Sequence, residues 1–270
     1  MNFAKSLVRR VLSKFGFQIT RIESNLVRFE AFNNLASAYE ELTSEEILPD
    51  NKLRKILLAR VQGTPPTEAY SIIRSLHASK NLDGVVCEFG VAEGETSALI
   101  ANEILETNKT FHLFDSFQGL SVPCEKDKLI DDVLGLGNMA EYAGKMSFPE
   151  SALRYRLGAI SFPKDRTIIH KGFIDEVLRN DESLPTSVCF AYVDFDFYEP
   201  ILATLEFLDS VLTVGGVIVV DDYGFFSSGS KTAVDEWLEK VNSNSSRYQV
   251  IVAKSYEGKF ITIRKTSNAQ

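Results

Sequence analysis

The sequence predicts an α/β fold in which helices cover both faces of a seven-stranded, mostly parallel sheet. From residue 81 onward, short apolar runs alternate with segments of helical spacing, which is typical of βαβ units. The last two apolar runs flank a turn at 256–258, and this arrangement predicts a C-terminal antiparallel hairpin. Residues 1–63 show helical spacing and are expected to form an N-terminal helical extension.

The first 21 residues are basic. Residues 1–21 carry Lys5, Arg9, Arg10, Lys14 and Arg21 and no acidic residue, interleaved with apolar side chains. Such a helix can make peripheral contact with a membrane surface or an acidic partner. The simpler interpretation is a packed terminal helix with a solvated basic face.

Residues 64–270 are expected to form the main domain. Thr64, Pro65 and Pro66 fit the start of a helix that runs to about Ser79, because Pro is accommodated in a first helical turn. The expected strands are Gly84–Phe89, Thr110–Phe114, Thr167–His170, Ser187–Val193, Gly216–Val220, Tyr248–Ala253 and Phe260–Ile263. The expected helices are Glu95–Leu105, Ile174–Arg179, Pro200–Leu212 and Lys231–Val241. Residues 116–165 have few strand signals and predict a lid over a functional site.

Composition narrows the class of protein. With 270 residues, 44% hydrophobic and 24% charged, the chain is expected to be soluble and globular. The net charge of −8 argues against nucleic-acid binding. No apolar run reaches the roughly 20 residues of a membrane-spanning helix, and no signal peptide is recognisable. The three cysteines form no CxxC pair, so neither zinc nor disulfides are expected, and a cytoplasmic location follows.

A glycine-containing turn follows the first predicted strand. In the segment Glu88–Gly94, Gly90 and Gly94 would let a ligand approach the backbone at a helix N-terminus. The dinucleotide pattern G-x-G-x-x-G is missing, and no G-K-[ST] follows. Glu88 at the strand tip suits a cationic ligand. A purely structural turn remains the alternative.

Acidic residues end the later strands. Asp115 follows the second strand, where an acid can accept hydrogen bonds from ribose hydroxyls or can cap the next turn. Asp194 ends the fourth strand, and Asp221 and Asp222 end the fifth. Three converging carboxylates repel one another unless a cation lies among them, and Mg²⁺ is the simplest such cation. The alternative is that one Asp caps a helix and the others face water.

At these residues the chain resembles the macrocin and mycinamicin O-methyltransferases and the related coumarin-antibiotic sugar O-methyltransferases. The resemblance spans about residues 64–240, and four motifs occur in the family's order. They are Glu88–Gly94, Phe114–Leu120, Asp194–Pro200 and Gly215–Tyr223. The resemblance implies a Rossmann-like class I methyltransferase that transfers a methyl group from S-adenosylmethionine to a sugar hydroxyl with the help of Mg²⁺.

The resemblance also implies roles for individual residues. Asp194, Asp221 and Asp222 would hold the metal, and Asp194 would also act as the catalytic base. Glu88 with Gly90 would lie near the methionine end of the cofactor, Asp115 would hold the ribose, and Gly172 and Phe173 would border the adenine. The further cofactor-binding residues would be Val91, Gly94 and Ser116. Asp196 is not assigned as a ligand.

The acceptor is left open by departures from the family pattern. Phe195 replaces the Gly of D-G-D, Pro200 replaces a small hydroxyl residue, and Ser151–Gly158 replaces a lid element. We expect a small-molecule or glycan acceptor, with a catechol-like or phenolic hydroxyl as the alternative. A nucleotide-sugar oxidoreductase is disfavoured by the missing glycine pattern, and a non-catalytic cofactor-binding protein by the three Asp residues. The resemblance is consistent with a homo-oligomer.

Overall fold

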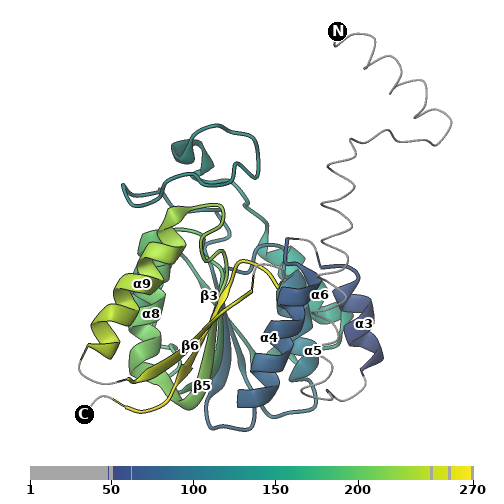
Figure 1. Cartoon of the computed structure of the whole chain (residues 1–270). Coiled ribbons are helices and arrows are strands. Elements are labelled where there is room, and N and C mark those ends of the chain that lie inside the picture. Colours follow the sequence, from purple (N-terminus) through teal and green to yellow (C-terminus); the bar gives the residue numbers. More distant parts are fainter. Residues whose placement is uncertain (1–47, 49–50, 62, 244–245, 255–256, 269–270) are drawn as a thin grey trace, which may run out of the picture. The chain divides into compact units, whose positions relative to one another are not determined.

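The computed structural model describes residues 48, 51–61, 63–243, 246–254 and 257–268, and element labels follow Figure 1. From Leu48 onward the chain forms one compact unit. The basic segment 1–21 and most of the predicted extension 1–63 lie outside the described residues. Among the described helices, none has the length and apolar character needed to cross a bilayer.

The predicted sheet is confirmed. Its seven strands have the order β3-β2-β1-β4-β5-β7-β6, with β7 antiparallel to both β5 and β6 and the other pairs parallel. The strands are β1 (Val85–Phe89), β2 (Phe111–Asp115), β3 (Thr167–Lys171), β4 (Val188–Val193), β5 (Leu212–Val220), β6 (Tyr248–Val252) and β7 (Ile261–Lys265). All six residues of β4 are buried, as expected for a central strand covered on both faces.

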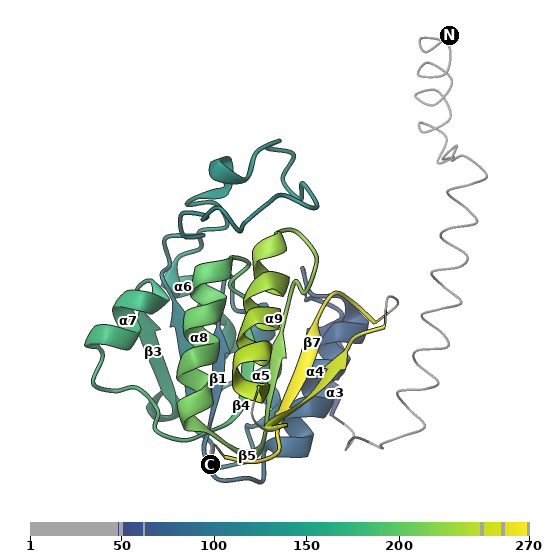
Figure 2. The ribbon, with the colours of Figure 1, turned by 60° about the vertical axis from the view of Figure 1, so that its left-hand side comes forward.

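Helices cover both faces of the sheet, as predicted (Figures 1 and 2). One face carries α3 (Lys52–Leu58), α4 (Pro66–Ser79), α5 (Glu95–Glu103) and α6 (Glu150–Ala159). The other carries α7 (Ile174–Asn180), α8 (Tyr198–Val211) and α9 (Ser228–Asn242). The short 3₁₀ helices are Met139–Tyr142 and Lys164–Arg166. Two apolar cores result, one on each side of the sheet.

The structure differs from the expectation for residues 116–165. Residues 150–159 form α6, whose Leu153 and Leu157 are buried in the same core as α4 and α5. The segment that lies over the carboxyl ends of the strands is therefore shorter, and we call residues 116–149 the cover segment (Figure 1). Similarly, α3 was expected in the extension but packs against α5 within the compact unit.

A buried ion-pair network joins α3, α4 and α5. The guanidinium of Arg54 donates to Glu103 with 2.7 Å between Nε and Oε1, and His77 Nε2 lies 2.8 Å from Glu103 Oε2. The Glu103 side chain is only 1% exposed. Burial alone would raise the pKa of Glu103, but the hydrogen bonds from Arg54 and His77 outweigh it and lower the pKa to about 2.

We predict that Glu103→Gln lowers the free energy of unfolding by about 3 kcal/mol at neutral pH, because it leaves the Arg54 charge buried without its counter-charge. Because the folded-state pKa is depressed from 4.5 to about 2, this stabilisation is present above pH 4.5 and is lost as the pH falls towards 2. Urea denaturation between pH 3 and pH 7 measures both effects. Glu106→Gln, an exposed position just beyond α5, is the control and should change little. Equal stability of the Glu103 variant at pH 7 would contradict the prediction.

Candidate active site

A cavity of about 480 Å³ lies where β1, β2, β4 and β5 end, beneath the cover segment. Ligands of open parallel sheets bind at this edge, because loops from several strands meet there. Eight acidic side chains line the cavity, and the described part of its wall contains no Lys, Arg or His. The acids are Glu88, Glu93, Glu95, Asp115, Asp194, Asp196, Asp221 and Asp222.

The glycine turn after β1 brings the backbone close to the end of β4. Gly90 has φ +86°, and a Cβ atom there would lie 1.9 Å from the backbone oxygen of Asp194. Gly94, with φ +82°, is the N-cap of α5 and lies against Leu153 of α6. Only glycine fits both the conformation and the space at Gly90. Gly90 and Val91 line the cavity, as the sequence predicts for cofactor-binding residues, whereas Gly94 does not.

Asp115 joins the ends of β1 and β2. Its Oδ2 accepts hydrogen bonds from the backbone N–H groups of Val91 at 2.7 Å and Ala92 at 3.1 Å, and its Oδ1 accepts from Phe117 at 2.6 Å. The carboxylate thus shapes the glycine turn, while the residue also lines the cavity. Ser116 lines the cavity too, although its hydroxyl donates locally to the Gly119 carbonyl.

Two further predicted cofactor residues, Gly172 and Phe173, follow β3 and line the same cavity. The Gly172 N–H donates to the Asp115 carbonyl at 3.0 Å, which ties the ends of β2 and β3 together. Seven of the eight predicted cofactor residues therefore meet around one space, with Gly94 set behind it at the start of α5.

Glu88 differs from the other predicted cofactor-binding residues in the burial of its carboxyl group. It is fully buried, and neither of its carboxyl oxygens has a hydrogen-bond partner among the described residues. Burial raises the pKa of Glu88 well above its usual range, the nearby Ser97 hydroxyl opposes this shift, and Asp115 adds to it. A buried carboxyl group without a partner is costly, so this position calls for a donor or a cation supplied by a ligand.

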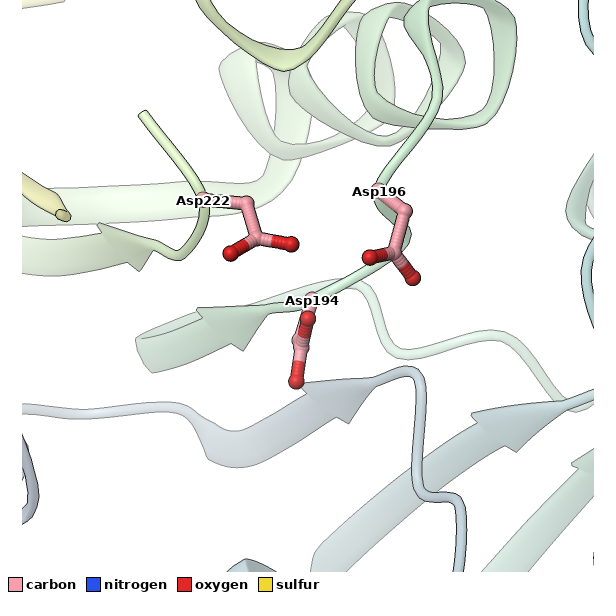
Figure 3. Close-up of side chains that lie close together, drawn as sticks. All are labelled: Asp194, Asp196 and Asp222. Atoms are coloured by element: carbon pink, nitrogen blue, oxygen red, sulfur yellow. The ribbon is translucent and has the colours of Figure 1, made fainter. Parts of the chain in front are cut away.

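Three carboxyl groups form a cluster at the ends of β4 and β5. One oxygen each from Asp194, Asp196 and Asp222 lies within 4.8 Å of the others (Figure 3). Backbone hydrogen bonds from Asp194 N to Phe89 O (2.7 Å) and from Asp221 N to Val193 O (2.9 Å) align these strand ends. Asp196 and Asp222 have φ values of +62° and +54°, conformations that are uncommon for residues other than glycine.

Asp221, a predicted metal ligand, lies beside this cluster and is not part of it. Its Oδ2 accepts a hydrogen bond from the Tyr192 hydroxyl at 2.6 Å, and its Oδ1 accepts from the backbone N–H of Asp222 at 2.7 Å. Asp196, which the sequence analysis left out of the ligand set, takes its place in the cluster. The structure therefore brings together Asp194 and Asp222 but adds Asp196 where Asp221 was expected.

The electrostatics of the cluster follow from burial and like charge. Burial, followed by the charge of Asp221, raises the pKa of Asp194 well above its usual range. Burial and Asp194 raise the pKa of Asp196 to about 7, and burial and Asp196 raise the pKa of Asp222. A divalent cation with oxygen ligands would stabilise the ionised carboxylates and relieve their repulsion, so the donor set fits Mg²⁺.

The cover segment is attached to the sheet domain through Asp127. This buried carboxylate accepts hydrogen bonds from the backbone N–H of Tyr198 at 2.8 Å and from the Ser227 hydroxyl at 3.1 Å. It thereby links the cover segment to the starts of both α8 and α9. The cover segment contributes four apolar side chains to the cavity wall, Leu120, Val133, Met146 and Phe148, beside Ser116, Gly119 and Ser121.

Sequence reasoning missed Asp196 as a cluster member, although the D-x-D spacing at a strand end was a usable signal. Tyr198 and Tyr223 adjoin the acidic residues in the sequence, but neither lines the cavity. The Tyr198 hydroxyl instead donates to Glu236, and that of Tyr223 donates to Asp235.

We predict that Gly90→Ala lowers the free energy of unfolding by more than about 3 kcal/mol, because the new methyl group clashes with backbone as well as requiring a left-handed conformation. Gly135→Ala is the matched control: its φ is +70°, but nothing lies within 4 Å of the added atom. That control should cost only about 1 kcal/mol. Chemical denaturation measures the free energy of unfolding of both variants. Equal decreases in the two variants would show that the close approach at Gly90 does not contribute to the cost of the substitution.

Comparisons with known proteins agree with this geometry. NovP, an O-methyltransferase, superposes with a TM-score of 0.62 and 21% identity over 75% of this chain and 81% of its own. CalS11, a calicheamicin methyltransferase, superposes with a TM-score of 0.59 and 20% identity over 92% of this chain and 95% of its own. The SAH-bound Podospora anserina methyltransferase PaMTH1 superposes with a TM-score of 0.52 and 13% identity over 93% of this chain and 99% of its own. These likenesses show the fold.

No curated protein matches the chain. The profile of the macrocin O-methyltransferase (TylF) family, in contrast, matches residues 70–251, which include the glycine turn and all the carboxyl groups described above. The chain therefore belongs to the macrocin O-methyltransferase family and is an S-adenosylmethionine-dependent O-methyltransferase.

Proposed function

We propose that the protein transfers the methyl group of S-adenosylmethionine to a hydroxyl group of a sugar or glycoside in a reaction that depends on Mg²⁺. The observation that carries this proposal is the placement of two acidic sites in one cavity. The carboxyl group of Glu88 is buried without a hydrogen-bond partner among the described residues, and the Asp194–Asp196–Asp222 cluster lines the same cavity.

The cofactor end fits a cationic amino acid group next to a nucleoside. Glu88 would pair with the amino group, and the turn at Gly90 and Val91 would lie against the methionine portion. Asp115 would accept from the ribose hydroxyls with lone pairs left over from its backbone contacts, and Phe173 would border the adenine. PaMTH1 holds SAH on the same fold, which supports this placement.

The metal end fits Mg²⁺ through Asp194, Asp196 and Asp222. Asp221 would support this set from behind, through the N–H of Asp222. We include Asp221 in the proposed site because it lines the same cavity and because the family resemblance implies it as a metal ligand. Bound S-adenosylmethionine would supply an electrophilic methyl group, and bound Mg²⁺ would supply a Lewis acid that lowers the pKa of an acceptor hydroxyl.

The residues of the chain would do the remaining work. Asp194 lines the cavity and belongs to the carboxyl cluster, and its carboxylate would accept the proton of the acceptor hydroxyl. The cover segment would exclude water and hold the acceptor oxygen in line with the methyl group. The apolar side chains Val133 and Phe148 would contact the body of the acceptor.

The charge of the cavity favours one type of acceptor. A nucleoside diphosphate is usually bound through basic side chains and helix N-termini in addition to any metal ion, and the described cavity wall has no basic side chain. The start of α8 is already occupied by Asp127. We therefore propose a neutral glycoside with an apolar portion, in contrast to CalS11, which one solved structure describes as a TDP-rhamnose 3'-O-methyltransferase.

The proposals on cellular location and on self-association rest on the sequence alone. We propose a cytoplasmic enzyme, with peripheral contact of residues 1–21 with the inner face of the membrane and self-association as additional features. The basic segment lies outside the described residues, so its charge pattern and the family resemblance support these proposals.

We predict that Asp194→Asn lowers kcat by about 10²–10⁴-fold, because it removes both the proton acceptor and a metal ligand. Its Kd for S-adenosylmethionine should stay within about threefold of the unchanged chain, because Glu88 and Asp115 remain. Calorimetry and a radiolabelled methyl-transfer assay measure the two quantities, and chelation of Mg²⁺ should abolish transfer by the unchanged chain.

Asp83→Asn is the control for this experiment, because Asp83 is exposed before β1 at the opposite end of the sheet. It should leave both quantities unchanged. Retained turnover in Asp194→Asn would remove Asp194 from the proposed mechanism, and a folded chain that binds no S-adenosylmethionine would overturn the cofactor site.

We predict that sugars are methylated when they carry a neutral apolar aglycone and not when they carry a nucleoside diphosphate. The measurement compares methyl transfer to pairs of acceptors that share one sugar, such as phenyl rhamnoside and TDP-rhamnose. Adding TDP should not inhibit transfer to the neutral member. Preferential methylation of the nucleotide-linked sugar would contradict the proposed acceptor class while leaving the methyltransferase assignment intact.

A further inference from the structure

The loops that carry Asp196 and Asp222 share one support, the carboxyl group of Asp127. This residue of the cover segment is only 6% exposed and does not line the cavity. Its Oδ1 accepts hydrogen bonds from the backbone N–H of Tyr198 at 2.8 Å and from the Ser227 hydroxyl at 3.1 Å. Tyr198 follows Asp196 by two residues, and Ser227 follows Asp222 by five. A single oxygen atom therefore joins the two loops.

Further contacts fix the position of the Asp127 carboxyl group. Its Oδ2 accepts a hydrogen bond from the Cys124 backbone N–H at 2.8 Å. Gly229, in the first turn of α9, leaves room for Oδ1, because a Cβ atom there would overlap Oδ1 and lie 2.7 Å from the Tyr198 backbone nitrogen. A buried carboxylate needs donors that replace its lost hydration. The backbone and hydroxyl donors around Asp127 therefore make this place specific for an acceptor.

The contact with Tyr198 lies at the end of a strained turn. Asp196 is the central residue of a three-residue turn in which the Phe197 N–H donates to the Phe195 carbonyl at 2.6 Å, and its φ is +62°. Such turns with positive φ are rare and persist only where surrounding contacts hold them. The next N–H along the chain, that of Tyr198, is the one that donates to Asp127. This turn presents the Asp196 carboxyl group to the cluster (Figure 3).

The cover segment also packs against both loops through apolar side chains. Phe197 and Phe226, one from each loop, belong to a small buried core to which the cover segment contributes Tyr142. The ring centroids of Tyr142 and Phe226 are 4.7 Å apart. A backbone hydrogen bond adds to this contact, because the Ile130 N–H donates to the Phe226 carbonyl at 2.8 Å. The conformation of the cover segment and the separation of the two loops are thereby linked.

We propose that Asp127 is a positioning residue of the metal site: it holds the loops after β4 and β5 at the separation that brings the carboxyl groups of Asp196 and Asp222 together. The consequence for metal binding rests on the proposed function, whereas the consequence for the separation of the loops does not. Because coupling between two sites is reciprocal, metal binding also stabilises the cover segment where Asp127 anchors it. Outer contacts that orient metal ligands contribute about 10- to 100-fold to metal affinity in other proteins.

The test compares Asp127→Asn with Asp127→Ala in the full chain. The Asn side chain keeps an oxygen for Tyr198 and Ser227, whereas Ala removes it, and both variants remove the same negative charge. Glu125→Ala is the control, because Glu125 is an exposed acidic residue of the same segment. Mn²⁺ titration followed by electron paramagnetic resonance reports metal affinity, and calorimetry reports S-adenosylmethionine affinity. Metal-free crystal structures report the separation of the two loops.

We expect Asp127→Asn and Glu125→Ala to bind Mn²⁺ within about threefold of the unchanged chain. Asp127→Ala should bind Mn²⁺ at least about tenfold more weakly. Its two loops should lie further apart, because the like-charged carboxyl groups repel one another once the shared support is gone. S-adenosylmethionine affinity should stay within about threefold in all variants, because Asp127 does not line the cavity.

A second measurement uses the unchanged chain and does not depend on the folding of a variant. Amide hydrogen exchange at Tyr198 and over residues 124–130 should slow at least about tenfold when Mn²⁺ saturates the site, because metal binding stabilises the loops that hold these groups. Exchange in α3, on the opposite face of the sheet, should not change and serves as the internal control.

Equal Mn²⁺ affinity in Asp127→Ala and Asp127→Asn would overturn the proposal, as would an unchanged separation of the loops in the Ala variant. A matching loss of S-adenosylmethionine affinity would overturn it too, because the variant would then be generally disrupted. Mn²⁺ binding that leaves exchange at Tyr198 unchanged would contradict the reciprocal effect. If the unchanged chain binds no Mn²⁺, the proposed metal dependence fails, and the loop separation in the crystal structures alone decides the role of Asp127.

Discussion

The gathering of eight acidic residues around one cavity at the edge of the sheet, with no basic side chain in the described wall of that cavity, is the constraint on which this structure depends. Removing such groups from water is unfavourable unless hydrogen-bond donors or cations replace the lost hydration. Asp115 accepts hydrogen bonds from backbone N–H groups, and Asp221 accepts one from the Tyr192 hydroxyl. In the proposed function, the sulfonium and amino groups of S-adenosylmethionine and a divalent metal would supply positive charge to the remaining carboxyl groups.

The ends of the parallel strands bring these acidic residues together. Hydrogen bonds between strand ends bring Phe89, Asp194 and Asp221 side by side, so residues far apart in sequence share one edge. Left-handed residues then turn the chain within three residues of three strand ends: Gly90 after β1, Asp196 after β4 and Asp222 after β5. Conformational strain is thus concentrated where ligands would bind, and the two apolar cores on either side of the sheet hold the strained residues in place.

Most of the fold could be predicted because it is encoded locally. Each strand is a short apolar run between polar or glycine-containing turns, and the observed bounds mostly lie within one or two residues of the expected ones, with β5 beginning earlier, at Leu212. Helix α6 was hidden because only Leu153 and Leu157 are buried on it, and charged residues surround them. The orientation of Asp221 could not be predicted, because its Oδ2 accepts a hydrogen bond from Tyr192, which is distant in sequence.

The attachment of the cover segment has a consequence for how such enzymes diversify. Asp127 fixes one part of that segment to backbone and hydroxyl groups at the starts of α8 and α9, so the attachment makes little demand on neighbouring side chains. The residues that face the cavity from this segment, such as Val133 and Phe148, belong neither to the carboxyl cluster nor to the glycine turn. Substitutions there can reshape the chamber without disturbing the reaction centre. Evolution can therefore change what is methylated separately from how methylation occurs.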